Sequence, residues 1–168
     1  STKTERPLVT DFATSSVGRG KIEIARREGK KIPKGWIIDK HGNSSQNVDE
    51  LKEGGMLTPL GSLEELGSHK GYALGSLVDI LSGVLSGANF GKWVPPFVSY
   101  LPLLPNLPGK GLGHFVGAME VDGFRSVEEF KTSMDIWINS FKNAERVDEN
   151  KPVYVPGEIE FNTKETRL

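Results

Sequence analysis

The segment Ser68-His69-Lys70-Gly71 carries the residue types best suited to binding an anion. It precedes a long stretch with helical apolar spacing, so we expect it to form the first turn of a helix. The backbone N–H groups of a first turn lack partners within the helix and lie at the positive end of its dipole. Together with the ammonium of Lys70, such a turn suits a pyrophosphate or a carboxylate. An exposed lysine beside an ordinary helix start explains the same residues without a ligand.

A second candidate site follows the stretch 7–12, which is predicted to be a short buried strand. The stretch from Asp11 to Ser16 places small polar residues at the end of that strand and before a helix expected over residues 17–28. Ligands of α/β proteins favour such strand ends. Capping of the helix explains these hydroxyl side chains equally well.

A glycine-rich loop, residues 109–113, invites comparison with phosphate-binding loops. The Walker pattern fails, because no Gly-Lys-Ser/Thr follows at the required spacing. The dinucleotide fingerprint fails as well, because His114 occupies its third glycine position and a strand, expected over residues 114–121, follows in place of a helix. A flexible loop before a strand is the simpler interpretation.

The sequence offers no acid–base or metal-binding constellation. None of His41, His69 and His114 pairs with another ligand at metal-binding spacing, so we expect no metal site. The absence of cysteine excludes disulfides, thiolate metal sites and a cysteine nucleophile. The Gly-x-Ser-x-Gly elbow of serine hydrolases does not occur either. Asp79, inside the long helix, is expected to hydrogen-bond a neighbouring group, and no catalytic residue is assigned.

The elements that must position these residues mix strands and helices without regular βαβ alternation. This favours a single α/β (mixed α+β) domain, with a mixed or antiparallel sheet flanked by helices. The helix over residues 127–142 is the best defined, because Ser126 and Glu129 form a capping box before an apolar stripe. The other expected helices span residues 17–28 and 69–87, and the expected strands residues 7–12, 36–39, 114–121 and 151–161, the last with a turn and then a polar tail.

Four glycines recur at multiples of four along the helix expected over residues 69–87: Gly71, Gly75, Gly83 and Gly87. Each costs about 1 kcal/mol relative to alanine in a helix. We therefore expect something to approach this face closely, either a packed backbone or a ligand.

Composition narrows the classes of partner. The 168 residues carry a net charge of -1, so no overall attraction to nucleic acid or membrane is expected. Glycine, serine and aspartate interrupt the longest apolar stretch, residues 72–88, which therefore does not predict a membrane span. We expect a cytoplasmic protein. The chain starts abruptly, a few residues before an apolar strand, and this leads us to expect a missing partner segment.

Five stretches in order along the chain resemble the malate/L-lactate dehydrogenase type-2 family, which is unrelated to the Rossmann-type lactate and malate dehydrogenases. They are LVTDFATS (8–15), IPKGW (32–36), GSHKGY (67–72), DILSGVLSG (79–87) and PGE (156–158). The resemblance covers nearly the whole chain. It implies a non-Rossmann nucleotide-binding fold, and it implies that residues 1–168 form the C-terminal NAD(P)-binding part of a longer dehydrogenase.

The resemblance also implies a site and a reaction. The family's positions for NAD or NADP fall on Asp11, Phe12, Ala13, Lys70, Gly157, Glu158 and Ile159. The family transfers a hydride between NAD(P) and the hydroxyl-bearing carbon of a 2-hydroxy acid such as malate or lactate, giving the 2-oxo acid. Its proton-accepting histidine and substrate-binding residues lie upstream of the segment that matches Ser1. The resemblance thus implies an absent catalytic N-terminal half, a homodimer, and a fragment that is inactive alone.

One alternative is a protein that has the same fold but no catalytic activity. Because no acid–base constellation is found, the chain is also compatible with a non-catalytic binding or assembly module.

Overall fold

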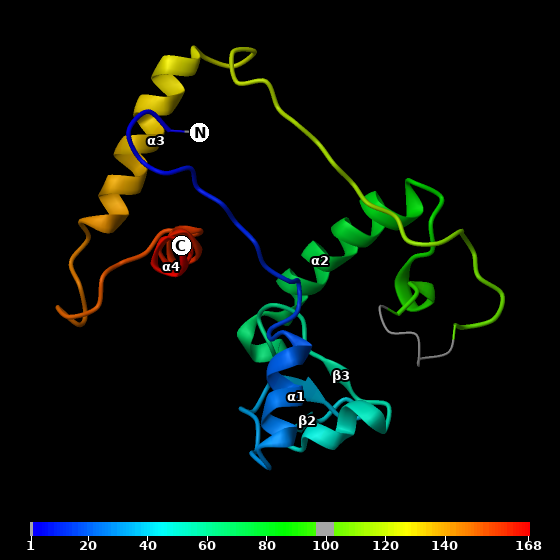
Figure 1. Cartoon of the computed structure of the whole chain (residues 1–168). Coiled ribbons are helices and arrows are strands. Elements are labelled where there is room, and N and C mark those ends of the chain that lie inside the picture. The colour runs from blue at the N-terminus through cyan, green and yellow to red at the C-terminus, as the bar shows by residue number, and fades with distance from the viewer. Residues whose placement is uncertain (1, 97–102) are drawn as a thin grey trace. The chain divides into compact units, whose positions relative to one another are not determined.

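The computed structural model describes residues 2–96 and 103–168 (Figure 1). The chain divides into two compact units rather than the single domain that was expected. Unit 1 combines Ser1–Phe12 with Gly117–Leu168, and unit 2 is the continuous stretch Ala13–Val116.

Unit 2 contains a small antiparallel sheet in the order β2-β1-β3. The central strand β1 (Ile37–Ile38) confirms the strand expected over residues 36–39. It pairs with β2 (Ser44–Ser45) and with β3 (Met56–Leu57), so that Ile37 lies opposite Ser45 on one side and Leu57 on the other. A five-residue 3-10 helix, η1 (Val48–Lys52), lies between the two outer strands in sequence.

Helix α1 (Arg19–Arg27) packs against this sheet and closes the core of unit 2 (Figure 1). Ile22 of α1 is 1% exposed and Ile37 of β1 is fully buried. Val17 and Ile32 complete the buried cluster. The helix begins two residues later than expected, and its N-cap is Gly18, without a side-chain cap.

The hydroxyl residues before α1 therefore do not cap it. The Ser16 hydroxyl lies 2.6 Å from the Thr58 hydroxyl, and the Ser15 hydroxyl donates to the carbonyl of Val17. Thr58 is 3% exposed and donates in turn to the carbonyl of Gly35 at 2.6 Å. A buried hydroxyl such as that of Thr58 needs hydrogen-bond partners. Here these contacts connect the segment before α1 to the residue that follows β3.

Helix α2 (Ser68–Asp79) continues into a π-helical turn, η3 (Ile80–Val84), and confirms most of the helix expected over residues 69–87. A Cβ at Gly71 would collide with the backbone of Leu60, and one at Gly83 would lie 2.9 Å from the carbonyl of Asn89. Gly75 has only ordinary contacts, and Gly87, with φ +76°, lies just beyond the helical turns. A packed backbone rather than a ligand thus explains Gly71 and Gly83. No helix in residues 2–96 and 103–168 is long and apolar enough to cross a membrane.

The glycine-rich loop packs against the end of this helical segment. Asn89 is 2% exposed; its amide oxygen accepts from the N–H of Gly109 at 3.1 Å, and its amide nitrogen donates to the carbonyl of Gly111 at 2.9 Å. Both carboxylate oxygens of Asp79 accept from the N–H of Gly91, which confirms the expected structural role of Asp79. Short 3-10 turns precede and follow the helix, η2 (Glu64–Leu66) and η4 (Gly91–Trp93).

Residues 114–121 do not form the expected strand, and neither do residues 7–12 or 151–157. The segment before Phe12 makes one backbone hydrogen bond to a distant residue, from the N–H of Val9 to the carbonyl of Pro156 at 3.2 Å. The β-branched and aromatic composition of these stretches suits a strand. A strand also needs a neighbour to supply a ladder of hydrogen bonds, and here none pairs with them.

Two helices dominate unit 1. Helix α3 (Val127–Lys142) has the predicted bounds, and the hydroxyl of Ser126 accepts from the N–H of Glu129 as a capping box requires. Helix α4 (Glu158–Arg167) occupies residues that were expected to be a turn and a polar tail.

The close approach of Gly71 to Leu60 predicts a specific loss of stability. Replacement of Gly71 by alanine should destabilise unit 2 by about 1–3 kcal/mol, because the clash involves backbone that cannot move aside. Gly75→Ala, in the same helix, should instead be neutral or stabilise by up to about 1 kcal/mol. Urea unfolding followed by far-UV circular dichroism measures both changes. Equal effects of the two substitutions would contradict the packing role of Gly71.

Candidate functional site

A cavity in unit 1 brings together three of the residues to which the resemblance assigns cofactor binding. It has a volume of about 620 Å³, and Asp11, Gly157 and Ile159 line it. This volume falls within the range of roughly 300–1,000 Å³ typical of small-molecule and cofactor sites. The other lining residues are Val9, Tyr154, Val155, Pro156, Glu160, Phe161 and Lys164. The walls are largely apolar, with three charged side chains, those of Asp11, Glu160 and Lys164.

Gly157 fixes the corner of this cavity. Its φ of +95° lies in the left-handed region, which side chains strongly disfavour. A Cβ there would also lie 3.1 Å from the Cβ of Val9 and 3.2 Å from its backbone nitrogen. Only glycine satisfies both conditions, and it lets the N-terminal segment pass directly beside the start of α4. Asp11, two residues after Val9, thereby reaches the cavity.

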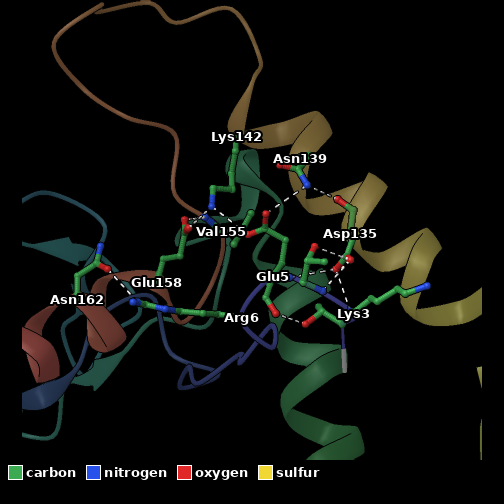
Figure 2. A network of polar contacts seen from close by, with 11 residues as sticks. Lys3, Glu5, Arg6, Asp135, Asn139, Lys142, Val155, Glu158 and Asn162 are labelled. Carbon is green, nitrogen blue, oxygen red and sulfur yellow. Dashed lines mark hydrogen bonds and ion pairs between the residues drawn. The ribbon is translucent and has the colours of Figure 1, made fainter. Parts of the chain in front are cut away.

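Lys142, at the end of α3, holds the start of α4 and the N-terminal segment together, and Figure 2 shows this network. Its ammonium lies 2.9 Å from the Glu158 carboxylate and 3.2 Å from that of Glu5. The second oxygen of Glu158 accepts from the N–H of Val155 at 3.0 Å, and Asn139 donates to Glu5 at 3.3 Å. We name this set the Lys142 clamp: Glu5, Asn139, Lys142, Val155 and Glu158.

The Lys142 clamp shifts the protonation of its members. The hydrogen bond from Lys142 lowers the pKa of Glu158 below its ordinary value of 4.5. Hydrogen bonds to Glu158, and then to Glu5, raise the pKa of Lys142 above 10.5. Both groups therefore keep their charges across the neutral range. The Glu158 carboxylate is engaged by the Lys142 clamp, and Glu158 does not line the cavity. Glu158 therefore holds the start of α4 in place beside the cavity.

Further contacts fasten the N-terminal segment along α3 and α4 (Figure 2). The carboxylate of Asp135 accepts from the N–H groups of Lys3 and Thr4 at 3.1 and 2.9 Å. Burial, which by itself raises the pKa of Asp135, is outweighed by these hydrogen bonds, which lower it. Arg6 donates to Asn162 at 3.0 Å, forms an ion pair with Glu165 and lies over the ring of Phe161.

The predicted anion site at the start of α2 lies in unit 2 and differs from the expectation. The N–H of Ser68 donates to the carbonyl of Leu63, and the N–H of Lys70 donates to that of Gly67. These amides are thus already satisfied within the chain. The exposed Lys70 side chain runs back along Gly67, where a Cβ would lie 3.8 Å from its ammonium. Its charge, more than the backbone amides, is what this helix start offers to an anion.

A second cavity, of about 420 Å³, follows the glycine face of α2. Thr14 and Ser15, from the small polar residues after the stretch 7–12, line it together with Gly71, Gly75 and Asp79 of the helix. The hydroxyl-bearing cluster and the glycine face of α2, which are far apart in the sequence, therefore meet within unit 2. Lys70 does not line this cavity.

The two remaining assigned residues, Phe12 and Ala13, lie where the sequence passes from unit 1 to unit 2. Phe12, the last residue of the first segment of unit 1, is 63% exposed and does not line the unit 1 cavity. Ala13 is exposed and begins unit 2. The structure thus gathers Asp11, Gly157 and Ile159 and gives Glu158 a supporting role.

The cavity residues that the sequence reasoning missed lie mainly on α4. Glu160 and Phe161 were placed in the strand and turn of residues 151–161, and Lys164 in a polar tail, and so their common helical face was not recognised. A signal was present: acidic residues Glu158 and Glu160 follow Gly157, and Lys164 and Arg167 come a few residues later. Acidic residues in a first turn and basic residues in a last turn are typical of a helix.

The described residues offer binding groups more than reactive ones. Across residues 2–96 and 103–168, no three His, Asp or Glu side chains are placed to hold a metal ion. The unit 1 cavity is lined by an acid at each of positions 11 and 160, a lysine and a tyrosine, and by no histidine. Such a cavity can hold a flat ring against its apolar walls and hydroxyl or phosphate groups at its charged side chains.

Comparison with known proteins gives the family. The sequence model of the malate/L-lactate dehydrogenase family matches residues 1–168. The malate dehydrogenase of Pyrococcus horikoshii is 40% identical over 165 residues, 98% of this chain and 44% of the relative. Hydroxycarboxylate dehydrogenase B of Escherichia coli strain K12 is 32% identical over 164 residues, 96% of this chain and 41% of the relative. The chain thus spans less than half the length of these relatives.

Solved structures agree on the fold. The crystal structure of malate dehydrogenase from Entamoeba histolytica has a TM-score of 0.77 and 32% identity, over 99% of this chain and 46% of that one. Malate dehydrogenase from Pyrococcus horikoshii gives a TM-score of 0.73 and 36% identity, over 98% and 42%. The expected mixed α/β, non-Rossmann class is confirmed. The chain belongs to the malate/L-lactate dehydrogenase family.

The Lys142 clamp predicts a pH-dependent contribution to stability. At neutral pH, Glu158→Gln should lower the free energy of unfolding by about 1 kcal/mol, a figure that discounts a charged hydrogen bond for partial solvent exposure. Because the folded state lowers the pKa of Glu158, this contribution is present above pH 4.5 and is lost as the pH falls through the folded pKa. Urea unfolding at neutral pH and well below pH 4.5 measures the difference.

Glu160→Gln is the matched control, since it removes the same charge from the same helical turn without touching Lys142. It should change stability by a few tenths of a kcal/mol at either pH, as expected for an exposed charge near a helix N-terminus. A Glu158→Gln effect of equal size at both pH values would show that the ion pair is not its source.

Proposed function

We propose that this chain is the cofactor-binding part of an NAD(P)-dependent oxidoreductase that acts on 2-hydroxy acids such as malate or lactate. The observation that carries the proposal is the family match over all 168 residues. Relatives named malate dehydrogenase and hydroxycarboxylate dehydrogenase support the class of reaction. The cavity that gathers Asp11, Gly157 and Ile159 supports the cofactor.

The residues present fit part of a nicotinamide dinucleotide. The apolar walls formed by Val9, Ile159 and Phe161 suit a flat ring, and the Asp11 carboxylate suits the hydroxyls of a ribose. In unit 2, Lys70 offers an exposed ammonium to a phosphate group. Phe12, Ala13, Gly157 and Glu158 complete the proposed set, with Gly157 and Glu158 holding the shape of the unit 1 site.

NAD or NADP bound there would accept a hydride from the hydroxyl-bearing carbon of the substrate, and would return it in the reverse direction. The residues of this chain bind and orient that group and keep water from the apolar wall of the cavity. The proton of the substrate hydroxyl needs a base, which in the family is a histidine. The resemblance predicts that this histidine lies in a part of the enzyme that residues 1–168 do not cover. The C-terminal position of this chain within such an enzyme is part of the same proposal.

Several finer properties belong to the proposal as well. The resemblance predicts a homodimer, and the absence of cysteine is in keeping with the cytoplasm. The choice between NAD and NADP, and between malate, lactate and other 2-hydroxy acids, is open to direct assay with a family-length protein.

Calorimetric titration with NADH and NADPH tests the proposal. The 168-residue chain should bind at least one of them weakly and should not oxidise malate or lactate, whereas a protein of the length of its relatives should turn over. If the chain binds neither cofactor and the longer protein is inactive, the chain is better described as a non-catalytic binding or assembly module.

The role of Lys70 gives a sharper prediction. Lys70→Ala should weaken binding of the preferred cofactor about tenfold, because a charge-assisted contact to phosphate contributes about 1.5–3 kcal/mol and part of it is lost to solvent. Lys34→Ala, which removes another exposed lysine of unit 2, is the control and should leave affinity within twofold. Equal affinity of the Lys70 variant and the unaltered chain would exclude Lys70 from the site.

A further inference from the structure

Lys164 lies in the unit 1 cavity together with Asp11, Gly157 and Ile159. The resemblance does not include it among the cofactor positions. Its place follows from α4: Gly157, Glu160, Phe161 and Lys164 are spaced three or four residues apart. Residues at this spacing lie on one face of a helix, here the face that lines the cavity.

Lys164 differs from the other cations around α4. Lys142 is held by Glu5 and Glu158, and Arg6 is held by Glu165 and Asn162. Within the described part of the chain, no carboxylate lies within ion-pair distance of the Lys164 ammonium, and its side chain is exposed. The cavity therefore contains one ammonium without an ion-pair partner, together with the carboxylates of Asp11 and Glu160 elsewhere on its lining. Such a charge on an apolar wall is suited to an anionic ligand.

We propose that Lys164 is a further cofactor-binding residue, whose ammonium binds a phosphate group of the dinucleotide in the unit 1 cavity. This inference rests on the proposed function. Phe161, one turn before Lys164 on the same face, and Val9 provide an apolar surface for the base that such a phosphate accompanies. Asp11 and Glu160 accept hydrogen bonds from ribose hydroxyls.

The phosphate comes from one of two places in the cofactor, and the chemistry is the same for both. It is either the 2′-phosphate that distinguishes NADP from NAD or the pyrophosphate that the two share. A lysine near a helix C-terminus ordinarily stabilises the helix by interacting with its dipole. If Lys164 had this role alone, its replacement would not change cofactor affinity. Arg167 lies in the same last turn and does not line the cavity, so it serves as the matched control for that role.

The experiment measures binding of NADH and NADPH to the 168-residue chain and to its Lys164→Ala, Lys164→Arg and Arg167→Ala variants. Circular dichroism verifies that each variant is folded. Lys164→Ala should weaken binding about tenfold, whereas Lys164→Arg and Arg167→Ala should remain within threefold of the unaltered chain. A loss for NADPH alone identifies the 2′-phosphate, and an equal loss for both identifies the pyrophosphate. Unchanged affinity of Lys164→Ala for both cofactors overturns the inference.

A second probe separates this inference from the proposed function. ADP-ribose and its 2′-phosphate carry the phosphates without the nicotinamide, and nitrogen-15 NMR reports their binding at the amides of Gly157 and Ile159. If the chain binds these probes in a Lys164-dependent way but binds no NAD(P)H, the phosphate-binding role of Lys164 stands, whereas its assignment to a nicotinamide cofactor fails together with the proposed function. If NADPH binds equally well to the unaltered chain and to Lys164→Ala, the inference fails and the proposed function stands. If neither the probes nor the cofactors bind, the inference fails, and the proposed function fails as well when the family-length protein is inactive.

Discussion

The contact of one ammonium with two carboxylates organises unit 1. Lys142 joins Glu5 of the N-terminal segment to Glu158 at the start of α4, and these two residues come from opposite ends of the chain. Ion pairs with this degree of exposure contribute little stability each. Their importance here is that they fix the orientation of the segments they join. Among the described residues of unit 1, only two hydrophobic side chains are buried, those of Ile138 and Val155. With so small a core, the polar contacts decide how α3, α4 and residues 3–11 are held together.

Unit 2 relies on a different constraint. Its helix α2 gives up helix propensity at Gly71 and Gly83 so that the backbones of Leu60 and Asn89 can lie against it. The same glycine face borders the second cavity, and Asn89 in turn fixes the glycine-rich loop through Gly109 and Gly111. The opposite side of α2 and η3 keeps large apolar side chains in solvent, Leu77 at 53% and Leu85 at 70% exposure.

The sequence predicted those elements whose signals are local. Helix α3 has a capping box and an apolar stripe within its own residues, and its bounds were predicted correctly. The strands predicted over residues 7–12 and 114–121 were wrong, because strand formation depends on a partner that the local sequence does not reveal. Helix α4 was missed because Pro156 and Gly157 were interpreted as a turn that ended the ordered structure.

The residues of the candidate site were predicted partly from local sequence patterns and partly from the family resemblance. Local reasoning identified Lys70 and the stretch from Asp11 to Ser16, whereas Gly157 and Ile159 followed from the resemblance. Asp11, Gly157 and Ile159 do line one cavity. The engagement of Glu158 by Lys142 depends on a long-range contact between α4 and α3, and no spacing in the sequence indicates it. Lys164 was out of reach for the same reason, because its place in the cavity requires α4 to exist.

The composition of unit 1 from the two ends of the chain has a consequence for how the protein is made. Unit 2 is one continuous stretch, so a chain growing from the ribosome can complete its core before residues 117–168 are synthesised. Unit 1 must wait, because Glu5 and Lys142 lie 137 positions apart and Gly157 comes later still. Contacts of such sequence separation slow folding. Until α4 emerges, residues 3–11 have no complete binding surface, and the cavity beside Gly157 therefore forms later than the core of unit 2.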